Sequence, residues 1–124
     1  MCKLLMSINP EHVCNILAGT KKFEFRKTKC REKVDGIVIY STAPIKQIVG
    51  EVEVTEIIEG SPQNVWKRTA YAAGIDKIFF DDYYDGRNNA VAYALGQIKK
   101  YKCPLSLSDF GITAAPQSYM YFRG

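Results

Sequence analysis

The apolar positions at the start of the chain predict a strand followed by a helix. Residues 3–8 are a short, mostly apolar run, which is typical of a strand. Asn9 and Pro10 mark a helix start, because Asn accepts hydrogen bonds from the first helical turn and Pro fits the first helical position. The helix is predicted to run to Ala18 and to end at Gly19, since glycine adopts the left-handed C-terminal cap at little cost.

The next segment, residues 21–27, alternates with a period of two, as a strand does. Its two phenylalanines, Phe23 and Phe25, would face one side. The charged side chains that would share the other side are Lys22, Glu24 and Arg26. Such a charged face is either a solvated outer surface or a site for an anionic or strongly polar ligand.

The rest of the pattern alternates between strands and helices. Strands are predicted at residues 37–40, 46–58, 89–101 and 118–122, and helices at residues 61–74 and 77–84. Gly50 predicts a bend or bulge in a long strand. A face of small residues predicts that another element packs closely on the strand 89–101; it consists of Ala90, Ala92, Ala94 and Gly96. We therefore expect an α+β fold in a single domain over residues 1–124, built as a small, mixed, nearly closed β-barrel with peripheral helices.

Charge is unevenly distributed along the chain of 124 residues, whose formal net charge is +4. Residues 20–34 contain seven Lys or Arg against two acids, a local net charge of +5, which favours an anionic partner. There is no apolar run long enough to cross a bilayer, and the first residues are too short for a signal sequence. These features predict a cytoplasmic protein without a membrane segment.

Patterns for metal or cofactor chemistry are absent from the sequence. The four cysteines (Cys2, Cys14, Cys30 and Cys103) lack metal-ligand spacing and are expected to be reduced thiols. There is no phosphate-binding glycine loop and no Ser-His-Asp arrangement. His12, the only histidine, is predicted to point outward from the first helix, without a catalytic role. We expect no metal and no cofactor.

Four residues between the first helix and the second strand spell Gly-x-Lys-x-x-Glu-x-Arg: Gly19, Lys21, Glu24 and Arg26. In this position the motif resembles that of the ASCH domain, a branch of the PUA-like superfamily. Further segments resemble the small bacterial, archaeal and phage members; they are residues 7–10, 39–44, 84–86 and 116–119. The resemblance moves the predicted ligand contact from Lys22 to Lys21.

The resemblance implies a PUA-like barrel with a cleft beside the motif. Family members are thought to bind RNA or to act in transcription and translation. Some relatives hydrolyse acetylated cytidine, and others are described as ribonucleases. In the amidohydrolase branch the motif lysine is catalytic and matches Lys21, whereas a catalytic threonine falls at the position of Glu24.

Our leading prediction is a module that binds RNA or a modified nucleoside or nucleotide. Lys21 and Arg26 would neutralise phosphate or donate to a base, and Glu24 would accept from an exocyclic amino group. Further ligand contacts are expected from Lys27, Ser41, Thr42, Tyr84, Gln117 and Ser118. Alternatives are a purely structural Glu24–Arg26 ion pair, an enzyme of the same fold with Lys21 as a catalytic residue, and a protein-interaction domain whose partners the sequence does not predict.

Overall fold

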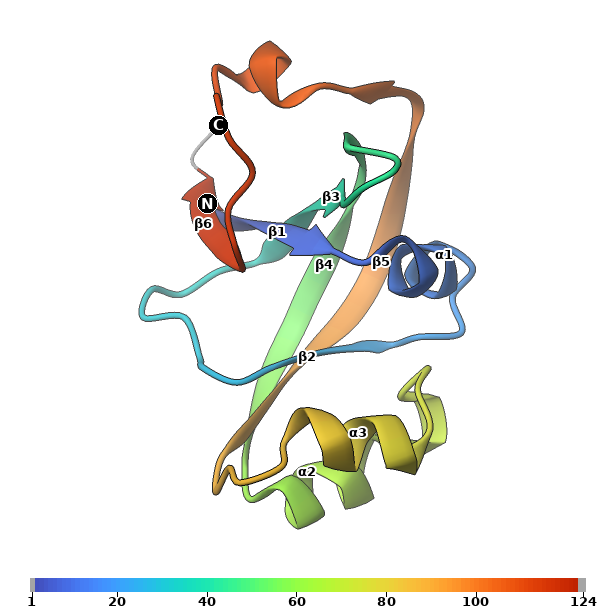
Figure 1. Ribbon diagram of the computed structural model, residues 1–124, viewed down its shortest axis with the longest axis vertical. Helices are drawn as coiled ribbons and strands as arrows, with labels where there is room; N and C mark the ends of the chain where they lie inside the picture. Colours follow the sequence, from blue (N-terminus) through green and yellow to red (C-terminus); the bar gives the residue numbers. More distant parts are fainter. Residues whose placement is uncertain (1, 123–124) are drawn as a thin grey trace.

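A curled sheet of six strands organises the protein, and the computed structural model describes residues 2–122 (Figure 1). The strands are β1 (Lys3–Ile8), β2 (Phe23–Arg26), β3 (Gly36–Ser41), β4 (Gln47–Gly60), β5 (Ala90–Leu105) and β6 (Tyr119–Phe122). Their order in the sheet is β2-β5-β4-β3-β1-β6, with β1 and β3 parallel and the other neighbours antiparallel. The sheet therefore forms a half-barrel whose two edges are β2 and β6, and the predicted α+β fold is confirmed.

Three short helices complete the fold. They are α1 (Pro10–Leu17), α2 (Pro62–Thr69) and α3 (Lys77–Tyr83), with 3-10 turns η1 (Ala70–Ala72) and η2 (Leu107–Phe110). The predicted cap at Asn9 is present, since its side chain accepts from the amide of Glu11 at 2.9 Å. Asp76 caps α3 in the same way and accepts from the amide of Phe79 at 2.8 Å. No helix within residues 2–122 combines the length and apolar character needed to span a bilayer.

The second helix is shorter than predicted, because it ends at Thr69 and gives way to η1. The carbonyl of Ala72 accepts a hydrogen bond from the amide of Lys22 at 2.9 Å, and that of Ala73 accepts from the Lys21 side chain at 3.0 Å. These carbonyls therefore accept hydrogen bonds from the segment that leads into β2, and not from a further turn of helix. Gly74 then turns the chain toward α3 with a φ of +72°.

Alternation along β5 separates two cores on opposite faces of the sheet. Val91 and Tyr93 point into a core that α1 covers with Val13 and Ile16. The small residues of β5 point the other way, onto aromatic side chains of β2 and α3; this second core includes Ala90, Ala92, Ala94, Phe23, Phe25 and Phe80. The predicted close packing on the small face is thus explained by aromatic rings.

The curl of the sheet is concentrated in β4, whose register with β5 shifts at three places. One shift lies between Ile48 and Gly50, where the sequence predicts a bend or bulge. A Cβ at Gly50 would lie 2.6 Å from the carbonyl oxygen of Lys99, so a larger residue would push the two strands apart. Bulges of this kind increase strand twist and let a sheet curl toward a barrel.

Candidate functional site

A pocket of about 140 Å³ opens between α1, β2 and α3. It is lined by Ser7, Ile8, Asn9, His12, Lys21, Glu24, Phe25, Arg26, Ile75, Phe79 and Tyr83. The end of β1 and the first turn of α1 form one wall, and α3 forms the other. The charged residues of the motif lie between these walls, so the structure brings Lys21, Glu24 and Arg26 together in one pocket.

Lys21 is buried although it precedes β2, with only 3% of its surface exposed. The left-handed turn at Gly19 brings the chain back, and the Lys21 amide then donates to the carbonyl of Asn15 at 3.0 Å. Gly74 leaves room for this passage, because a Cβ there would lie 2.4 Å from the Cβ of Lys21. The Lys21 ammonium donates to the carbonyl of Ala73 at 3.0 Å and lies 4.8 Å from the centre of the Phe25 ring.

Burial lowers the pKa of the Lys21 ammonium, because the charged form loses hydration. The nearby carboxylate of Glu24 acts in the opposite direction and raises this pKa, and the guanidinium of Arg26 lowers it further. Lys21 is therefore a partly desolvated amine that faces a carboxylate across a small pocket.

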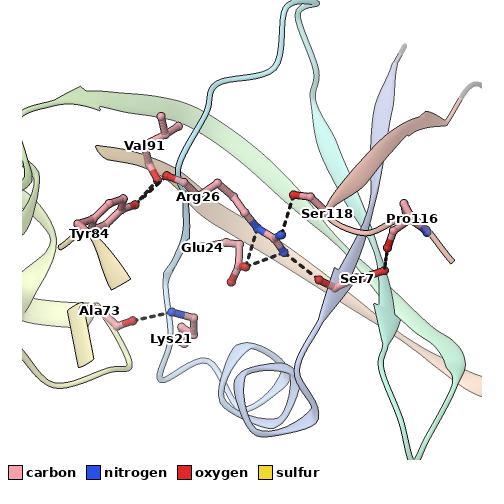
Figure 2. A network of polar contacts seen from close by, with 9 residues as sticks. All are labelled: Ser7, Lys21, Glu24, Arg26, Ala73, Tyr84, Val91, Pro116 and Ser118. Atoms are coloured by element: carbon pink, nitrogen blue, oxygen red, sulfur yellow. Dashed lines mark hydrogen bonds and ion pairs between the residues drawn. The ribbon is translucent and has the colours of Figure 1, made fainter. Parts of the chain in front are cut away.

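Glu24 and Arg26 form a buried ion pair that also joins distant parts of the sheet (Figure 2). Glu24 is 5% exposed, and its Oε2 accepts from Nε of Arg26 at 3.1 Å and from Nη2 at 3.0 Å. The guanidinium also donates to the carbonyl of Ser7 at 3.0 Å and to Oγ of Ser118 at 3.1 Å. Because β2 and β6 are the two edges of the sheet, Arg26 bridges the opening of the half-barrel with side-chain hydrogen bonds.

The segment before β6, which contains Pro116 and Ser118, is also hydrogen-bonded to Ser7 of β1. The hydroxyl of Ser7 donates to the carbonyl of Pro116 at 2.7 Å, and the amide of Ser7 donates to the carbonyl of Ser118 at 3.1 Å. The structural ion pair considered from the sequence is thus present, although it connects strands and not a strand to a helix. Glu24 uses Oε2 for both contacts with Arg26, and within residues 2–122 its Oε1 has no hydrogen bond.

His12 faces this pocket, so the prediction of an outward His12 is wrong. Its ring packs edge-on against Phe79, with 5.4 Å between ring centres, and its Nδ1 is buried and has no hydrogen-bond partner among residues 2–122. Burial, followed by the charge of Lys21, lowers the pKa of His12. A signal was available in the sequence, because His12 precedes the core residue Ile16 by four positions and therefore shares a helix face with it.

Tyr83, and not the predicted Tyr84, lines the pocket. Tyr84 is 3% exposed, and its hydroxyl donates to the carbonyls of Arg26 at 2.8 Å and Val91 at 3.2 Å, so the ring is fixed in the second core. Lys27 lies at the rim, where its ammonium is 4.7 Å from the centre of the Tyr83 ring.

The other predicted contacts lie outside the pocket lining. Ser41 is buried at the end of β3, and the amide of Thr42 donates to the carbonyl of Ile8 at 3.0 Å, so both continue the sheet. Gln117 is exposed, and Ser118 reaches the site only through Arg26. Across residues 2–122, no group of three or more His, Cys, Asp and Glu side chains is placed to hold a metal ion, and the four cysteines are free thiols.

Comparisons with known proteins concern the family and the fold of the chain. A family model described as the ASCH domain matches residues 6–102. A Zymomonas mobilis protein named ASCH domain-containing ribonuclease is 27% identical over 124 residues, covering 96% of this chain and 83% of that protein. The crystal structure of ASCH from Zymomonas mobilis superposes with a TM-score of 0.88 at 26% identity, covering 98% of this chain and 87% of that one.

Longer proteins contain a similar segment. The large ribosomal subunit protein uL22 of Ureaplasma parvum is 30% identical over 121 residues, which are 97% of this chain. The chain spans 39% of the length of that protein, and 15% of the length of an ATP synthase subunit alpha from the same species, to which it is 22% identical.

Proposed function

The chain belongs to the ASCH domain family, and on that premise we propose that its pocket binds an unpaired base of RNA. The family and the relative named a ribonuclease support an RNA-related function. The observation that carries the finer proposal is the pairing of a buried donor, Lys21, with a buried acceptor, Glu24, between aromatic side chains.

The pocket offers a nucleobase both kinds of polar contact. An ammonium has three N–H donors, and Lys21 uses one of them on the carbonyl of Ala73, so the others can reach a base carbonyl. Oε1 of Glu24 can accept from an amino or imino group of the same base. A cavity of about 150 Å³ is large enough for a six-membered aromatic ring, and this pocket has about 140 Å³.

Phosphate binding by Arg26 is not part of this proposal, although the sequence suggests it. The guanidinium already binds a carboxylate, a carbonyl and a hydroxyl, and removing it from them would leave Glu24 as an unpaired buried charge. Phosphates would instead remain outside the pocket, where Lys27 and the basic segment of residues 20–34 attract them.

Replacing Lys21 by Met tests the proposal, with Lys22→Met as the matched control. Lys22 is the adjacent, exposed lysine, so both variants lose one positive charge. Binding of labelled single-stranded RNA is measured by fluorescence anisotropy at low salt. A hydrogen bond to a charged group contributes about 1.5–3 kcal/mol, so Lys21→Met should weaken binding by about tenfold or more and Lys22→Met by much less. Equal effects of the two variants would refute a base contact by Lys21.

A second candidate function is ribonuclease activity, which the name of the Zymomonas relative and the position of His12 both favour. Cleavage without a metal requires a base that takes the proton of the ribose 2′-hydroxyl. The 2′-oxygen then attacks phosphorus, and the 5′-oxygen leaves with a proton from an acid. His12, Lys21 and Glu24 are pocket residues with the chemistry for these roles, and we assign the roles to His12 and Lys21 because Glu24 is paired with Arg26.

End-labelled RNA incubated in EDTA separates binding from cleavage. A ribonuclease of this kind should give a 2′,3′-cyclic phosphate that is lost in His12→Gln and in Lys21→Met prepared identically. A parallel assay with acetylcytidine tests the amidohydrolase alternative. In that branch a catalytic threonine stands at the position that Glu24 occupies in this chain. Tight binding without product from either substrate would leave the binding module as the function.

The same proposal includes a role in the control of transcription or translation, which the family resemblance implies, and a place in the cytoplasm, which the sequence predicts. Sequencing the RNA that cross-links to the wild type, and not to Lys21→Met, would identify the transcripts concerned. Recovery of the same RNA with both proteins would count against a role of the pocket.

A further inference from the structure

The wall that α3 contributes to the pocket is aromatic and extends beyond the pocket. Phe79 and Tyr83 are four residues apart on one face of α3, and both line the pocket. Phe79 nevertheless keeps 48% of its surface exposed. A half-exposed phenylalanine in the wall of a pocket that also holds charged groups is a surface on which a second flat ring can lie.

A cation lies beside one end of this stripe. The ammonium of Lys27 lies 4.7 Å from the ring centre of Tyr83. Asp81 is paired with Lys77 at 2.8 Å, and both of these residues line a different pocket, beside α2. A cation thus lies beside Tyr83, and the carboxylate of Asp81 is paired on another face of the helix. Asp82, three positions after Phe79, is an exposed acid near the platform, so the phosphate path is placed on the Lys27 side.

We propose that Phe79 is a stacking platform for the nucleotide next to the base in the pocket. The ligand is then single-stranded RNA of at least two nucleotides, with one base inserted between α1 and α3, its neighbour on Phe79, and the phosphate path near Lys27. This inference rests on the proposed function. It extends the site from a pocket for one base to a surface that binds two successive nucleotides. Aromatic side chains bind successive bases by stacking, with little dependence on sequence.

Duplex RNA is excluded by the same geometry. The polar groups of the pocket lie between two helices, and a base reaches them only when it is free of its pairing partner and of the stack. A neighbour stacked on Phe79 also replaces some of the stacking that the inserted base gives up.

The experiment compares the four nucleoside monophosphates with the four matching homodinucleotides by calorimetric titration. The proteins are the wild type, Phe79→Ala, Phe79→Leu, Phe79→Trp and Ile78→Ala. Ile78 is the control, because it is the adjacent apolar residue, is 77% exposed and does not line the pocket. The leucine variant keeps an apolar wall beside His12 while removing the ring.

A stacked base is worth about five- to hundredfold in affinity. The wild type, Phe79→Trp and Ile78→Ala should therefore bind a dinucleotide more tightly than its monophosphate by a factor in this range. Phe79→Leu and Phe79→Ala should lose most of that gain, so that their affinity for a dinucleotide falls further than their affinity for the monophosphate. An eight-nucleotide single strand should bind better than its duplex.

Other results would overturn the inference in distinguishable ways. A gain that persists in Phe79→Leu, or monophosphate binding that falls as far as dinucleotide binding, would make Phe79 a pocket wall only. Self-association of the wild type that Phe79→Ala abolishes would assign the surface to a second copy of the chain. Failure of every nucleotide to bind the wild type would refute the proposed function as well as this extension of it.

Discussion

Replacing Arg26 by Met should destabilise the protein strongly, because it leaves the carboxylate of Glu24 without its partner. Glu24 is 5% exposed, and both of its contacts with Arg26 are 3.0–3.1 Å long. Removing one partner of a buried ion pair costs about 3–5 kcal/mol. The carbonyl of Ser7 and the hydroxyl of Ser118 also lose a donor, so the two edges of the sheet lose their side-chain connection.

Urea denaturation measures this loss. A domain of ordinary stability unfolds with a free energy of about 5–15 kcal/mol, so the variant should fold but with a small margin. With a slope of about 2 kcal/mol per molar urea, a loss of about 4 kcal/mol lowers the midpoint by about 2 M. Arg68→Met is the control, because Arg68 and Glu56 are 4.0 Å apart and their side chains are 59% and 60% exposed. Such an exposed pair contributes about 0–1 kcal/mol.

A double variant decides whether the loss comes from the unpaired charge. Replacing both Glu24 and Arg26 by Met removes the buried carboxylate together with its partner, and such replacements are often nearly neutral. The double variant should therefore be more stable than Arg26→Met alone, because no buried carboxylate is left without a partner. An Arg26→Met variant that loses less than about 1 kcal/mol, or a double variant that is less stable than the single one, would refute this reasoning.

Three further predictions concern the surroundings of the pocket. Gly74→Ala should lower the free energy of unfolding, measured in urea, by well over the roughly 1 kcal/mol expected of Gly86→Ala. Both glycines have a φ above +70°, but only a Cβ at Gly74 would clash with Lys21. The pKa of His12, followed by NMR, should lie below 6.5, and stability should then fall as the pH drops below 6.5, because the unfolded chain takes up the proton first. Tyr84→Phe should lower the free energy of unfolding by about 1 kcal/mol, measured in urea, and leave RNA binding by anisotropy unchanged, since its hydroxyl bonds only backbone carbonyls.

Local signals in the sequence were sufficient for most of the fold. Asn9 and Asp76 form the caps that their residue types predict, because a cap depends on neighbours two or three positions away. Gly50 marks a real shift in register. The predicted end of α2 was wrong because the carbonyls of Ala72 and Ala73 accept hydrogen bonds from Lys22 and Lys21. These lysines are about fifty positions earlier in the chain, so no local pattern reveals them.

Of the residues in the pocket, the sequence predicted only those that belong to the motif. The motif placed Lys21 and Glu24 in the pocket, but it gave no sign that Arg26 bonds Ser118, which is 92 positions away. The predicted contact Tyr84 lies one position after the lining residue Tyr83, because α3 has seven residues and fewer than two full turns define its inward face.

The motif Gly-x-Lys-x-x-Glu-x-Arg therefore combines two roles that sequence alone does not separate. Glu24 holds Arg26 with one carboxylate oxygen, and the proposal assigns the other to a ligand, so any change at Glu24 disturbs both the sheet and the pocket. Arg26 belongs to the sheet, because its guanidinium binds Glu24, Ser7 and Ser118, which are all parts of the chain. Lys21 is the position at which the roles separate, since its ammonium makes one hydrogen bond to the chain and keeps donors for the pocket. Lys21→Met should thus weaken ligand binding far more than it lowers stability. Arg26→Met should do the reverse when binding is measured on the folded fraction. Parallel losses of binding and stability in both variants would show that the pocket and the Glu24–Arg26 ion pair cannot be separated.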